Sequence, residues 1–420
     1  MASTACKYLI AGSSHAALEA IHAIRMVDAD GTLTVVSRDR GLPYSPTVLP
    51  YVVSGKLEPE AVALRDARYL EENAVELRND AALTSLDAAG RRATLANGDI
   101  CEFEKLLLAT GATPIRPPIT GLDNVPHHVL RTMDDAVGLR HAMRDAQSAI
   151  VLGAGLIGMH AAENLARAGL KVSIVEMYSQ VLPGYFDAEA AAMITDAFSE
   201  AGVDMRLGQA AEAVNATAAG IELSLPDATV MGDILLVATG VRPVIDYLEG
   251  SGIETNEGVL VDDTMATSAA SVWAAGDVAQ ARDFYGPDRR VGGILPGAVE
   301  QGRIAGMAMA DDPGLKPYPG GVPLNTYSYF GHKAISVGRT AGEAKGAHPL
   351  VIETRREGSS YLAVALDGDR LAGIAAIDRP LDAGVMWQLI LRRIELGARL
   401  DDFLADPLTS GRRIMSETWR

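Results

Sequence analysis

Continuous apolar runs that end in glycine-rich turns are the clearest feature of the hydropathy pattern. One run leads into "KYLIAGSS" at residues 7–14, and a second leads into "AIVLGAG" at residues 149–155. An alanine- and leucine-rich stretch of helical character follows each turn, and then another apolar run. Strands that are apolar at every position are typical of parallel sheets buried on both faces. The pattern therefore predicts two β–α–β units, and with them two doubly wound α/β domains.

Two later apolar runs repeat each other and indicate where these domains close. "LLLATGATP" at residues 106–114 and "LLVATGVRP" at residues 235–243 both end in Ala-Thr-Gly, with a proline shortly after. We expect each run to end one nucleotide-binding domain and pass the chain to the next. The repeats therefore predict a discontinuous first domain, formed by residues 1–115 and 243–315, and a second domain over residues 116–242.

The pattern changes after residue 315. "PGLKPYPGG" at residues 313–321 is a connector rich in proline and glycine. "YLAVALDGDRLAGIAAI" at residues 361–377 contains an Asp-Gly turn between two apolar runs, which predicts an antiparallel hairpin. We expect one helix over "GVMWQLILRRIELGARLDDFL", residues 384–404, near the end of the chain. These elements predict a third domain of α+β type over residues 316–420.

Composition and charge exclude several classes of function. The chain has 420 residues, of which 48% are hydrophobic and 22% are charged, as in ordinary globular proteins. Its net charge of -17 disfavours nucleic acid as a partner, since phosphate binding requires basic surface. No apolar run reaches the roughly 18 residues of a membrane span, and the N-terminus reaches glycine too early for a secretory signal. We therefore expect a cytoplasmic protein.

The second glycine-rich turn has the spacing of a dinucleotide site. "GAGLIG" at residues 153–158 follows a predicted strand and opens a predicted helix, the context that such a motif requires. Its glycines permit a tight turn and the approach of a pyrophosphate to the helix N-terminus. Glu176 ends the next strand, where a carboxylate binds ribose hydroxyls and repels a 2′-phosphate, so NAD(H) is favoured over NADP(H). The predicted NAD(H)-binding residues are Gly153, Gly155, Leu156, Ile157, Gly158, Glu176, Ala238, Thr239 and Gly240.

The first turn is a weaker version of the same motif. It reads "GSSHAA" over residues 12–17, so that serine and alanine replace two of the three glycines. Both replacements are small enough to leave room for a nucleotide. Ser37 stands where a ribose-binding acid would be usual, and a serine hydroxyl can still bind a ribose weakly. Taken alone, this turn leaves a nucleotide site and an ordinary turn equally open.

The order of seven segments decides between these alternatives. They are GSSHAA, ATGATP, GAGLIG, Glu176, ATGVRP, AAGDVA and PGAVEQGR. The set resembles the pyridine nucleotide-disulfide oxidoreductase family over residues 1 to about 315. The resemblance implies FAD in the first domain, with Asp277 of AAGDVA binding the ribityl chain and the flavin phosphate. It also implies a C-terminal interface domain, and with it a possible homodimer.

The helix that begins near Pro296 is expected to direct its N-terminal N–H groups at the flavin and to stabilise negative charge on the reduced ring. The predicted FAD-binding residues are Gly12, Ser13, Ser14, His15, Ala16, Ser37, Pro46, Thr47, Ala109, Thr110, Gly111, Gly276, Asp277, Pro296, Gly297 and Ala298.

One departure from the family lies in "YSPTVLPYVVSGK" at residues 44–56. Thr47 stands where members of the family carry a redox cysteine. A threonine forms no disulfide, no sulfenic acid and no thiolate. The chain's two cysteines, Cys6 and Cys101, lie in other segments and form no CxxC pair. We therefore expect neither a dithiol relay nor a metal or cluster site within this chain.

A second departure is His160, in the helix that GAGLIG opens. Relatives carry a glutamate there, near the nicotinamide and flavin N5. Two interpretations are open for this histidine. It helps to position the nicotinamide, with a charge that follows the redox state of the flavin, or it is a packed neutral side chain with no part in hydride transfer.

Without a sulfur relay, electrons that pass between NAD(H) and the flavin have to be exchanged outside the chain. O2, a quinone or dye, and an iron–sulfur protein are the options, and an iron–sulfur partner is favoured because a flavin divides a hydride into single-electron steps. The length, the cysteine-free loop and "AGVMWQLILRRIELG" at residues 383–397 resemble the NAD-coupled FAD subunits of multi-subunit 2-oxoacid dehydrogenases of the phenylglyoxylate type. The alternatives are a stand-alone ferredoxin or rubredoxin reductase, an NADH oxidase, which Thr47 disfavours, and a non-catalytic binding module.

Overall fold

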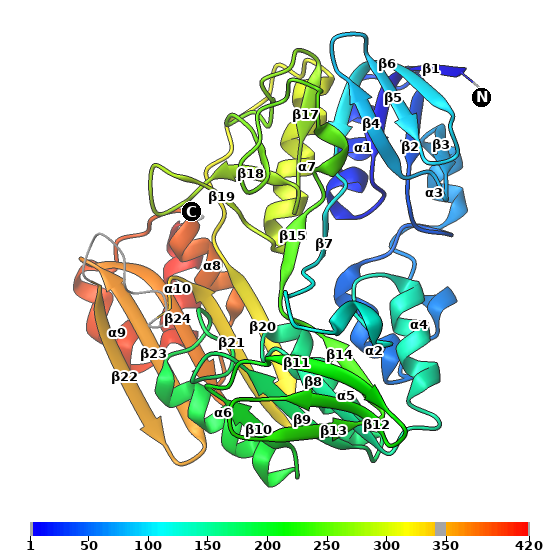
Figure 1. The fold of residues 1–420 in the computed structure, drawn as a ribbon. Helices are drawn as coiled ribbons and strands as arrows, with labels where there is room; N and C mark the ends of the chain where they lie inside the picture. The colour runs from blue at the N-terminus through cyan, green and yellow to red at the C-terminus, as the bar shows by residue number, and fades with distance from the viewer. Residues whose placement is uncertain (1–2, 341–349, 419–420) are drawn as a thin grey trace.

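The chain folds into two α/β units and an α+β unit, as its hydropathy pattern predicts (Figure 1). A computed structural model describes residues 3–340 and 350–418. In these ranges no helix is both long and apolar enough to cross a membrane. The predicted fold class is confirmed, whereas the exact residue boundaries of the three domains stay a prediction.

The first sheet joins two segments that lie far apart in the sequence. Its strand order is β3-β2-β1-β6-β5-β4, and β17 pairs in parallel with the C-terminal end of β6, at residues 106–108. Because β17 follows the second unit along the chain, this pairing returns the chain to the first unit. The strands are β1 (Ser3–Ala11), β2 (Leu33–Val36), β3 (Val75–Arg78), β4 (Leu83–Asp87), β5 (Arg92–Leu95), β6 (Ile100–Leu108) and β17 (Val272–Ala274).

Two helices of the first unit pack with their backbones in contact. They are α1 (His15–Val27) and α7 (Leu295–Met309). A Cβ built on Gly302 would overlap the backbone of Ala16, and a Cβ on Gly306 would lie 2.6 Å from the carbonyl oxygen of Ala20. Glycine is therefore required at both positions, and the close packing fixes α7 against the helix that starts at the first glycine-rich turn.

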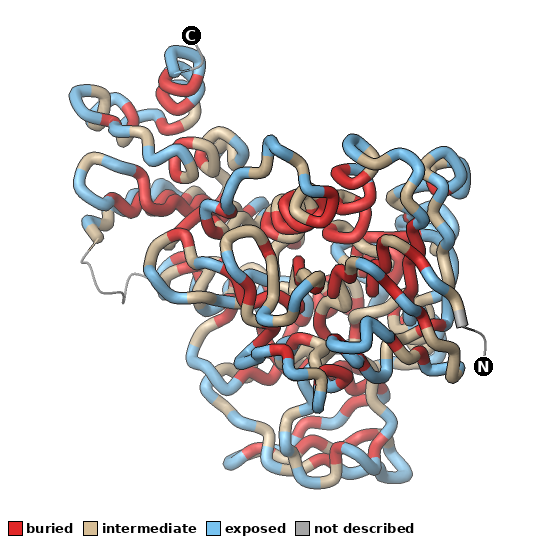
Figure 2. Tube along the Cα trace, turned by 90° about the horizontal axis from the view of Figure 1, so that it is seen from above, coloured by how far each residue is buried: buried red, intermediate tan, exposed pale blue. Residues whose placement is uncertain are grey.

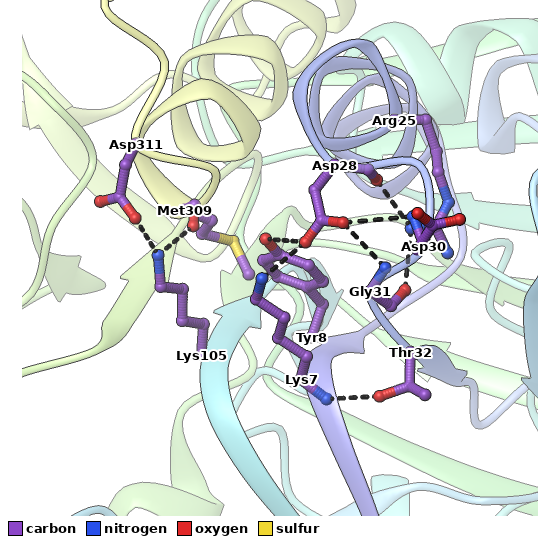
Figure 3. Close-up of polar contacts among 10 residues, drawn as sticks. All are labelled: Lys7, Tyr8, Arg25, Asp28, Asp30, Gly31, Thr32, Lys105, Met309 and Asp311. Carbon is purple, nitrogen blue, oxygen red and sulfur yellow. Dashed lines mark hydrogen bonds and ion pairs between the residues drawn. The ribbon is translucent and has the colours of Figure 1, made fainter.

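A polar network fastens the end of α1 to the sheet (Figure 3). The carboxylate of Asp28 accepts hydrogen bonds from Lys7 Nζ at 2.7 Å and from the Tyr8 hydroxyl at 2.9 Å. These donors hold the pKa of Asp28 well below its usual range, the lysine being the largest cause. Lys105 of β6 also reaches Asp311, just after α7, at 2.6 Å. The network stabilises the framework that carries the first glycine-rich turn.

The second α/β unit contains a parallel sheet of order β10-β9-β8-β14 and an antiparallel sheet of order β11-β12-β13. All four positions of β14 and four of five in β8 are buried, as expected of parallel strands covered on both faces. The strands are β8 (Ser148–Leu152), β9 (Lys171–Glu176), β10 (Asp204–Leu207), β11 (Ala213–Thr217), β12 (Gly220–Ser224), β13 (Thr229–Gly232) and β14 (Ile234–Val237). The helices are α4 (Met133–Ala142), α5 (Leu156–Arg167) and α6 (Ala188–Glu200).

The two α/β units are connected by a pair of crossing strands. β7 (Ala112–Pro114) pairs in antiparallel fashion with β15 (Val241–Pro243), and they run together between the units in Figure 1. Each strand comes directly after one Ala-Thr-Gly repeat, and because the pairing is antiparallel the two repeats lie at opposite ends of the pair. The other helices and strands before the C-terminal unit are α2 (Leu49–Val53), α3 (Ala67–Glu72), β16 (Val259–Leu260), β18 (Ala279–Arg282) and β19 (Arg289–Val291).

The C-terminal unit is an antiparallel sheet of order β20-β21-β24-β23-β22 with three helices. The predicted hairpin forms, with Asp367 paired to Arg370 across a turn at Gly368, where φ is +63°. The two strands of this hairpin are buried on both faces, because one face meets the second unit and the other meets the C-terminal helices. The elements are β20 (Leu324–Tyr329), β21 (His332–Gly338), β22 (Val351–Glu357), β23 (Ser360–Asp367), β24 (Arg370–Ile377), α8 (Ala383–Leu391), α9 (Leu400–Ala405) and α10 (Pro407–Thr418).

The prediction of one helix over residues 384–404 is wrong. The helix ends after Leu391, and a new one begins at Leu400. Arg393, just past the C-cap of the first helix, has a φ of +53°, which ends that helix in a left-handed turn, and Gly397, before the second helix, has a φ of +52°. Among the described residues, buried positions gather in the interior and exposed positions lie mainly on the outer loops (Figure 2).

Candidate functional site

The first glycine-rich turn lies where two strand ends meet. Gly12 directly follows β1 and has a φ of +117°. A Cβ at this position would overlap the carbonyl oxygen of Ala109, the residue that follows β6. The Ala109 N–H in turn donates to the Ala11 carbonyl at 2.8 Å. The predicted turns at 12–16 and 109–111 are therefore adjacent, and glycine is needed at residue 12 for both space and conformation.

These two turns line one concave pocket. Ser37 enters it from the end of β2, and the Ser13 hydroxyl donates to the Ser37 Oγ at 3.1 Å. The Ser14 hydroxyl donates to the Tyr44 carbonyl and does not cap α1. The first N–H groups of this helix therefore have no side-chain acceptor at the N-cap. The predicted residues in the pocket lining are Gly12, Ser13, Ser14, Ser37, Pro46, Ala109, Thr110 and Gly111.

Arg131 also lines this pocket, and the motifs did not reveal it. Its Nη2 lies 2.9 Å from Oδ2 of Asp277, and its Nε donates to the Ala112 carbonyl at 3.1 Å. Asp277 belongs to the segment after β17, so Arg131 with its two partners links three separate parts of the sequence. The side chains of Arg131 and Asp277 are 15% and 22% exposed, which screens the pair less than a surface pair. The pocket thus has a cation next to the predicted ribityl-binding acid.

The start of α7 is close to the start of α1. Gly276, with φ +79°, donates its N–H to Oε1 of the buried Gln301 at 2.8 Å. A Cβ built on Gly276 would lie 3.4 Å from the Ala16 Cβ and 3.7 Å from the Ala298 Cβ. Pro296 lies in the first turn of α7, and no side chain caps that helix. The structure therefore brings 276–277, 296–298 and 15–16 together, although these segments are far apart in the sequence.

Thr47 lies at the exposed start of the segment that leads into α2. Its Oγ1 is 2.7 Å from the Ser45 Oγ, and Ser45 is in turn 2.8 Å from Nε2 of His15. Burial is the main cause that lowers the pKa of His15 below its usual value. Ser45 was not among the predicted residues, because nothing in the sequence shows that residues 15 and 47 are neighbours. The structure joins two predicted FAD-site residues through this serine.

The second glycine-rich turn repeats the geometry of the first. Gly153 has a φ of +107°, and a Cβ there would lie 2.5 Å from the Ala238 carbonyl oxygen. A Cβ on Gly158 would overlap the Gly153 carbonyl, whereas a Cβ on Gly155 would meet nothing within 4 Å. Gly155 is the N-cap of α5 and provides no side-chain acceptor. The open space at this helix N-terminus is where a pyrophosphate is predicted to approach.

The remaining residues of the second predicted site lie around this turn. Leu156 and Ile157 form the first turn of α5, where Ile157 is 37% exposed. The Ala238 N–H donates to the Leu152 carbonyl at 2.8 Å, and the Thr239 hydroxyl donates to the Ile115 carbonyl at 3.2 Å. Gly240 has a φ of +118°. The second Ala-Thr-Gly repeat thus lies beside Gly153, as the first lies beside Gly12.

Glu176 is buried at the end of β9 with both oxygens oriented by the backbone. Oε2 accepts the Ala154 N–H at 2.7 Å, and Oε1 accepts the Tyr178 N–H at 2.9 Å. Ala154 is inside the GAGLIG turn, so the carboxylate is fixed relative to the turn itself. Each carboxylate oxygen can accept a second hydrogen bond, which leaves room for a ribose hydroxyl. That the negative charge at this position opposes a 2′-phosphate stays a prediction.

His160 lies on α5, with its ring against the edge of Tyr327 of β20. The ring centroids are 4.6 Å apart at an interplanar angle of 78°. Burial lowers the pKa of His160 below its usual value, so the imidazole is uncharged at neutral pH. Tyr327 is itself buried, and its hydroxyl has no hydrogen-bond partner among the described residues. The structure shows His160 packed against Tyr327, and both a part in hydride transfer and a purely structural role stay predictions.

Comparison with known proteins identifies the family. A family described as pyridine nucleotide-disulphide oxidoreductase matches residues 6–302. The chain belongs to this family. It is 54% identical over 415 residues to the NADH-dependent phenylglyoxylate dehydrogenase subunit epsilon of Aromatoleum evansii, covering 99% of this chain and 98% of that protein. It is 27% identical to the rhodocoxin reductase of Rhodococcus erythropolis, covering 89% and 87%.

Solved structures agree with this assignment. A ferredoxin reductase from Rhodopseudomonas palustris superimposes with a TM-score of 0.80 at 28% identity, covering 89% of this chain and 91% of that one. This member of the pyridine nucleotide-disulphide oxidoreductase family is an FAD-dependent NAD(H) oxidoreductase. The two turns fit the pyrophosphates of FAD and NAD(H), since no side chain caps α1 or α5 and a Cβ on Gly155 would meet nothing within 4 Å. The assignment of each residue to its cofactor stays a prediction.

The family's sulfur chemistry has no equivalent at Thr47. Cys6 and Cys101 are both free and buried, and they lie in β1 and β6 toward the ends opposite the glycine-rich turn. Burial raises the pKa of Cys6 to about 11, which leaves it a thiol at neutral pH. Among the described residues, no group of three or more His, Cys, Asp or Glu side chains could hold a metal ion.

Proposed function

We propose that this chain transfers electrons between NAD(H) and an iron–sulfur partner, as the flavin subunit of a multi-subunit 2-oxoacid dehydrogenase of the phenylglyoxylate type. The observation that carries the proposal is the combination of Thr47 with full-length similarity to an NADH-dependent phenylglyoxylate dehydrogenase subunit. FAD, when bound, supplies the conversion between a hydride and single electrons. With no dithiol at Thr47, those single electrons pass to or from another polypeptide.

The chain's own residues bind and orient the two cofactors. Gly12, Ser13 and the start of α1 would hold the FAD pyrophosphate, with Arg131 and Asp277 beside the ribityl chain. Gly155 and Glu176 would hold the pyrophosphate and adenosine ribose of NAD(H). The N-termini of α1 and α5, which no side chain caps, would supply N–H donors and a positive dipole end at both pyrophosphates.

A stand-alone NADH:ferredoxin reductase is the second candidate. It is supported by the 27% identity to rhodocoxin reductase and the 28% identity to a ferredoxin reductase structure. The two candidates predict different native particles. A subunit of a larger enzyme copurifies with other chains and with iron, whereas a stand-alone reductase is isolated as a monomer or homodimer that contains FAD and no iron.

Native purification under anaerobic conditions tests the proposal. We expect a particle much larger than 44.2 kDa, with FAD, several iron atoms per flavin and additional polypeptides. Reduction of NAD⁺ by that particle, driven by phenylglyoxylate, would identify the substrate class. An iron-free particle with this chain as its sole polypeptide would contradict the subunit assignment. Its mass would also test the predicted homodimer.

A further inference from the structure

A chain of hydrogen bonds occupies the position where the family carries its redox cysteine. His15 Nε2 lies 2.8 Å from the Ser45 Oγ, and the Ser45 Oγ lies 2.7 Å from the Thr47 Oγ1. Ser45 is buried and also accepts the Thr47 N–H at 3.3 Å, so both neighbours hold its side chain in place. Thr47 is exposed and His15 is half-buried, so the buried serine separates two accessible ends.

All three side chains can accept and donate a proton. A serine or threonine hydroxyl donates one hydrogen bond and accepts two, and neutral imidazole has one donor and one acceptor nitrogen. We propose that His15, Ser45 and Thr47 form a proton relay between solvent and the predicted flavin pocket. A proton enters at the imidazole of His15, crosses the Ser45 Oγ and leaves from the Thr47 Oγ1. The relay functions in both directions, because each hydroxyl can exchange donor and acceptor roles.

The reaction balance shows why such a path is needed, if the proposed function is correct. Two reduced one-electron carriers, NAD⁺ and one H⁺ give two oxidised carriers and NADH. Iron–sulfur carriers deliver electrons without protons, so the single proton in the new hydride has to come from elsewhere. In the reverse direction the same proton is released. Hydride transfer from NADH to the bound flavin brings its own proton, so this half-reaction does not require the relay.

Charged groups from three parts of the structure face His15. Glu19 lies one turn further along α1, Asp277 lies after β17, and Arg65 lies before α3. The two carboxylates favour the protonated imidazole, whereas burial and Arg65 oppose it, and burial is the largest effect. The pKa of His15 is therefore below its usual value, and the imidazole is uncharged at neutral pH. It can accept a proton from solvent and pass one inward in the same step.

Ser45→Ala tests the relay in the FAD-loaded protein. Two rates are compared: proton uptake after flash reduction by deazaflavin radicals, followed with a pH indicator, and flavin reduction by NADH. We expect the rate of proton uptake, divided by the rate of flavin reduction by NADH, to fall about tenfold or more. Positioned proton-transfer groups typically contribute at least that much. Because Ser45 also accepts the Thr47 N–H, Thr47→Val serves as a second variant that leaves this serine in place, and it should lower the ratio similarly.

Ser54→Ala is the matched control. Its hydroxyl donates to the Tyr51 carbonyl, just after α2 and outside the relay, so the ratio of the two rates should stay at the wild-type value. The ¹⁵N resonances of labelled histidines give a readout independent of turnover. Ser45→Ala should shift the Nε2 resonance of His15 most, since it removes that atom's partner. The flavin midpoint potential should stay within about 30 mV, which for two electrons is a tenfold change in equilibrium constant.

An unchanged rate ratio in both variants would overturn the relay, as would an unshifted His15 resonance in Ser45→Ala. Because deazaflavin radicals replace the iron–sulfur partner, these outcomes do not depend on which protein the chain binds. An iron-free native particle would contradict the subunit assignment and leave the relay measurements valid. The two proposals can therefore fail separately.

Discussion

The guanidinium Nη2 of Arg131 lies 2.9 Å from the carboxylate Oδ2 of Asp277, across 146 positions of sequence. Arg131 precedes α4, at the edge of the second unit, whereas Asp277 follows the returning strand β17 of the first unit. The pair therefore closes one side of the predicted FAD pocket. Neither side chain is fully exposed, so loss of one partner leaves the other charge poorly compensated.

Arg131→Met is expected to weaken FAD binding. Removal of the guanidinium takes a cation from the pocket and leaves the Asp277 carboxylate without its partner, at a cost of about 1–3 kcal/mol, or about fivefold to 150-fold in Kd. Fluorescence titration of the chain with FAD measures this change. Arg140→Met is the control, because its partner Glu58 is 61% exposed and lies outside the pocket. Equal FAD affinity in the two variants would contradict the role of Arg131.

Gly155→Trp should abolish reduction by NADH while FAD stays bound. A Cβ at this position meets nothing within 4 Å, so the fold tolerates a side chain that fills the predicted pyrophosphate space. Gly153→Ala is the contrasting variant, because its φ of +107° and the nearby Ala238 carbonyl make a Cβ destabilising. In thermal unfolding, Gly153→Ala should have a lower Tm than the wild-type protein, whereas Gly155→Trp should not. Normal NADH reduction in Gly155→Trp would mean that the nucleotide binds elsewhere.

Glu176→Gln should reduce the preference for NADH over NADPH. The amide keeps one oxygen for the backbone N–H donors but removes the charge that opposes a 2′-phosphate. We expect the ratio of kcat/KM values for the two nucleotides to fall about tenfold, which corresponds to about 1.4 kcal/mol. Steady-state dye reduction with each nucleotide gives this ratio. An unchanged ratio would show that the carboxylate only anchors the turn.

His160 should make the fold less stable in mild acid. In the unfolded chain this histidine titrates near 6.5, whereas burial lowers its pKa in the folded chain. As the pH falls through 6.5, the unfolded chain binds the proton first, so the free energy of unfolding decreases until the pH is below the folded pKa. His160→Gln should make this decrease smaller in urea unfolding at several pH values. A titration of the His160 resonance at or above 6.5 would contradict the prediction.

Local sequence patterns were sufficient to predict the two β–α–β units and the C-terminal hairpin. Continuous apolar runs, glycine spacing and an Asp-Gly turn act over a few residues, so they can be recognised without knowledge of tertiary contacts. The break in the C-terminal helix was missed, because Leu391 to Leu400 keeps a helical composition. Only the positive φ of Arg393 and Gly397 shows the turn.

The candidate site was predictable as two sets of motifs but not as an arrangement. Glycines at 12 and 153 are recognisable because the turn itself requires them. Arg131 and Ser45 carry no motif, and their importance comes from partners that the fold brings close. The same applies to the contact between His160 and Tyr327, whose positions are joined only through packing of α5 on β20.

Anaerobic titration of the isolated, FAD-loaded chain with NADH tests the central claim most directly, since that claim makes flavin the sole redox centre of this polypeptide. The flavin absorbance near 450 nm follows the reaction. One NADH per chain should bleach the flavin completely, with no long-wavelength band from a thiolate beside the oxidised ring. Consumption of two NADH per chain, or the appearance of such a band, would show a second redox centre and contradict the account.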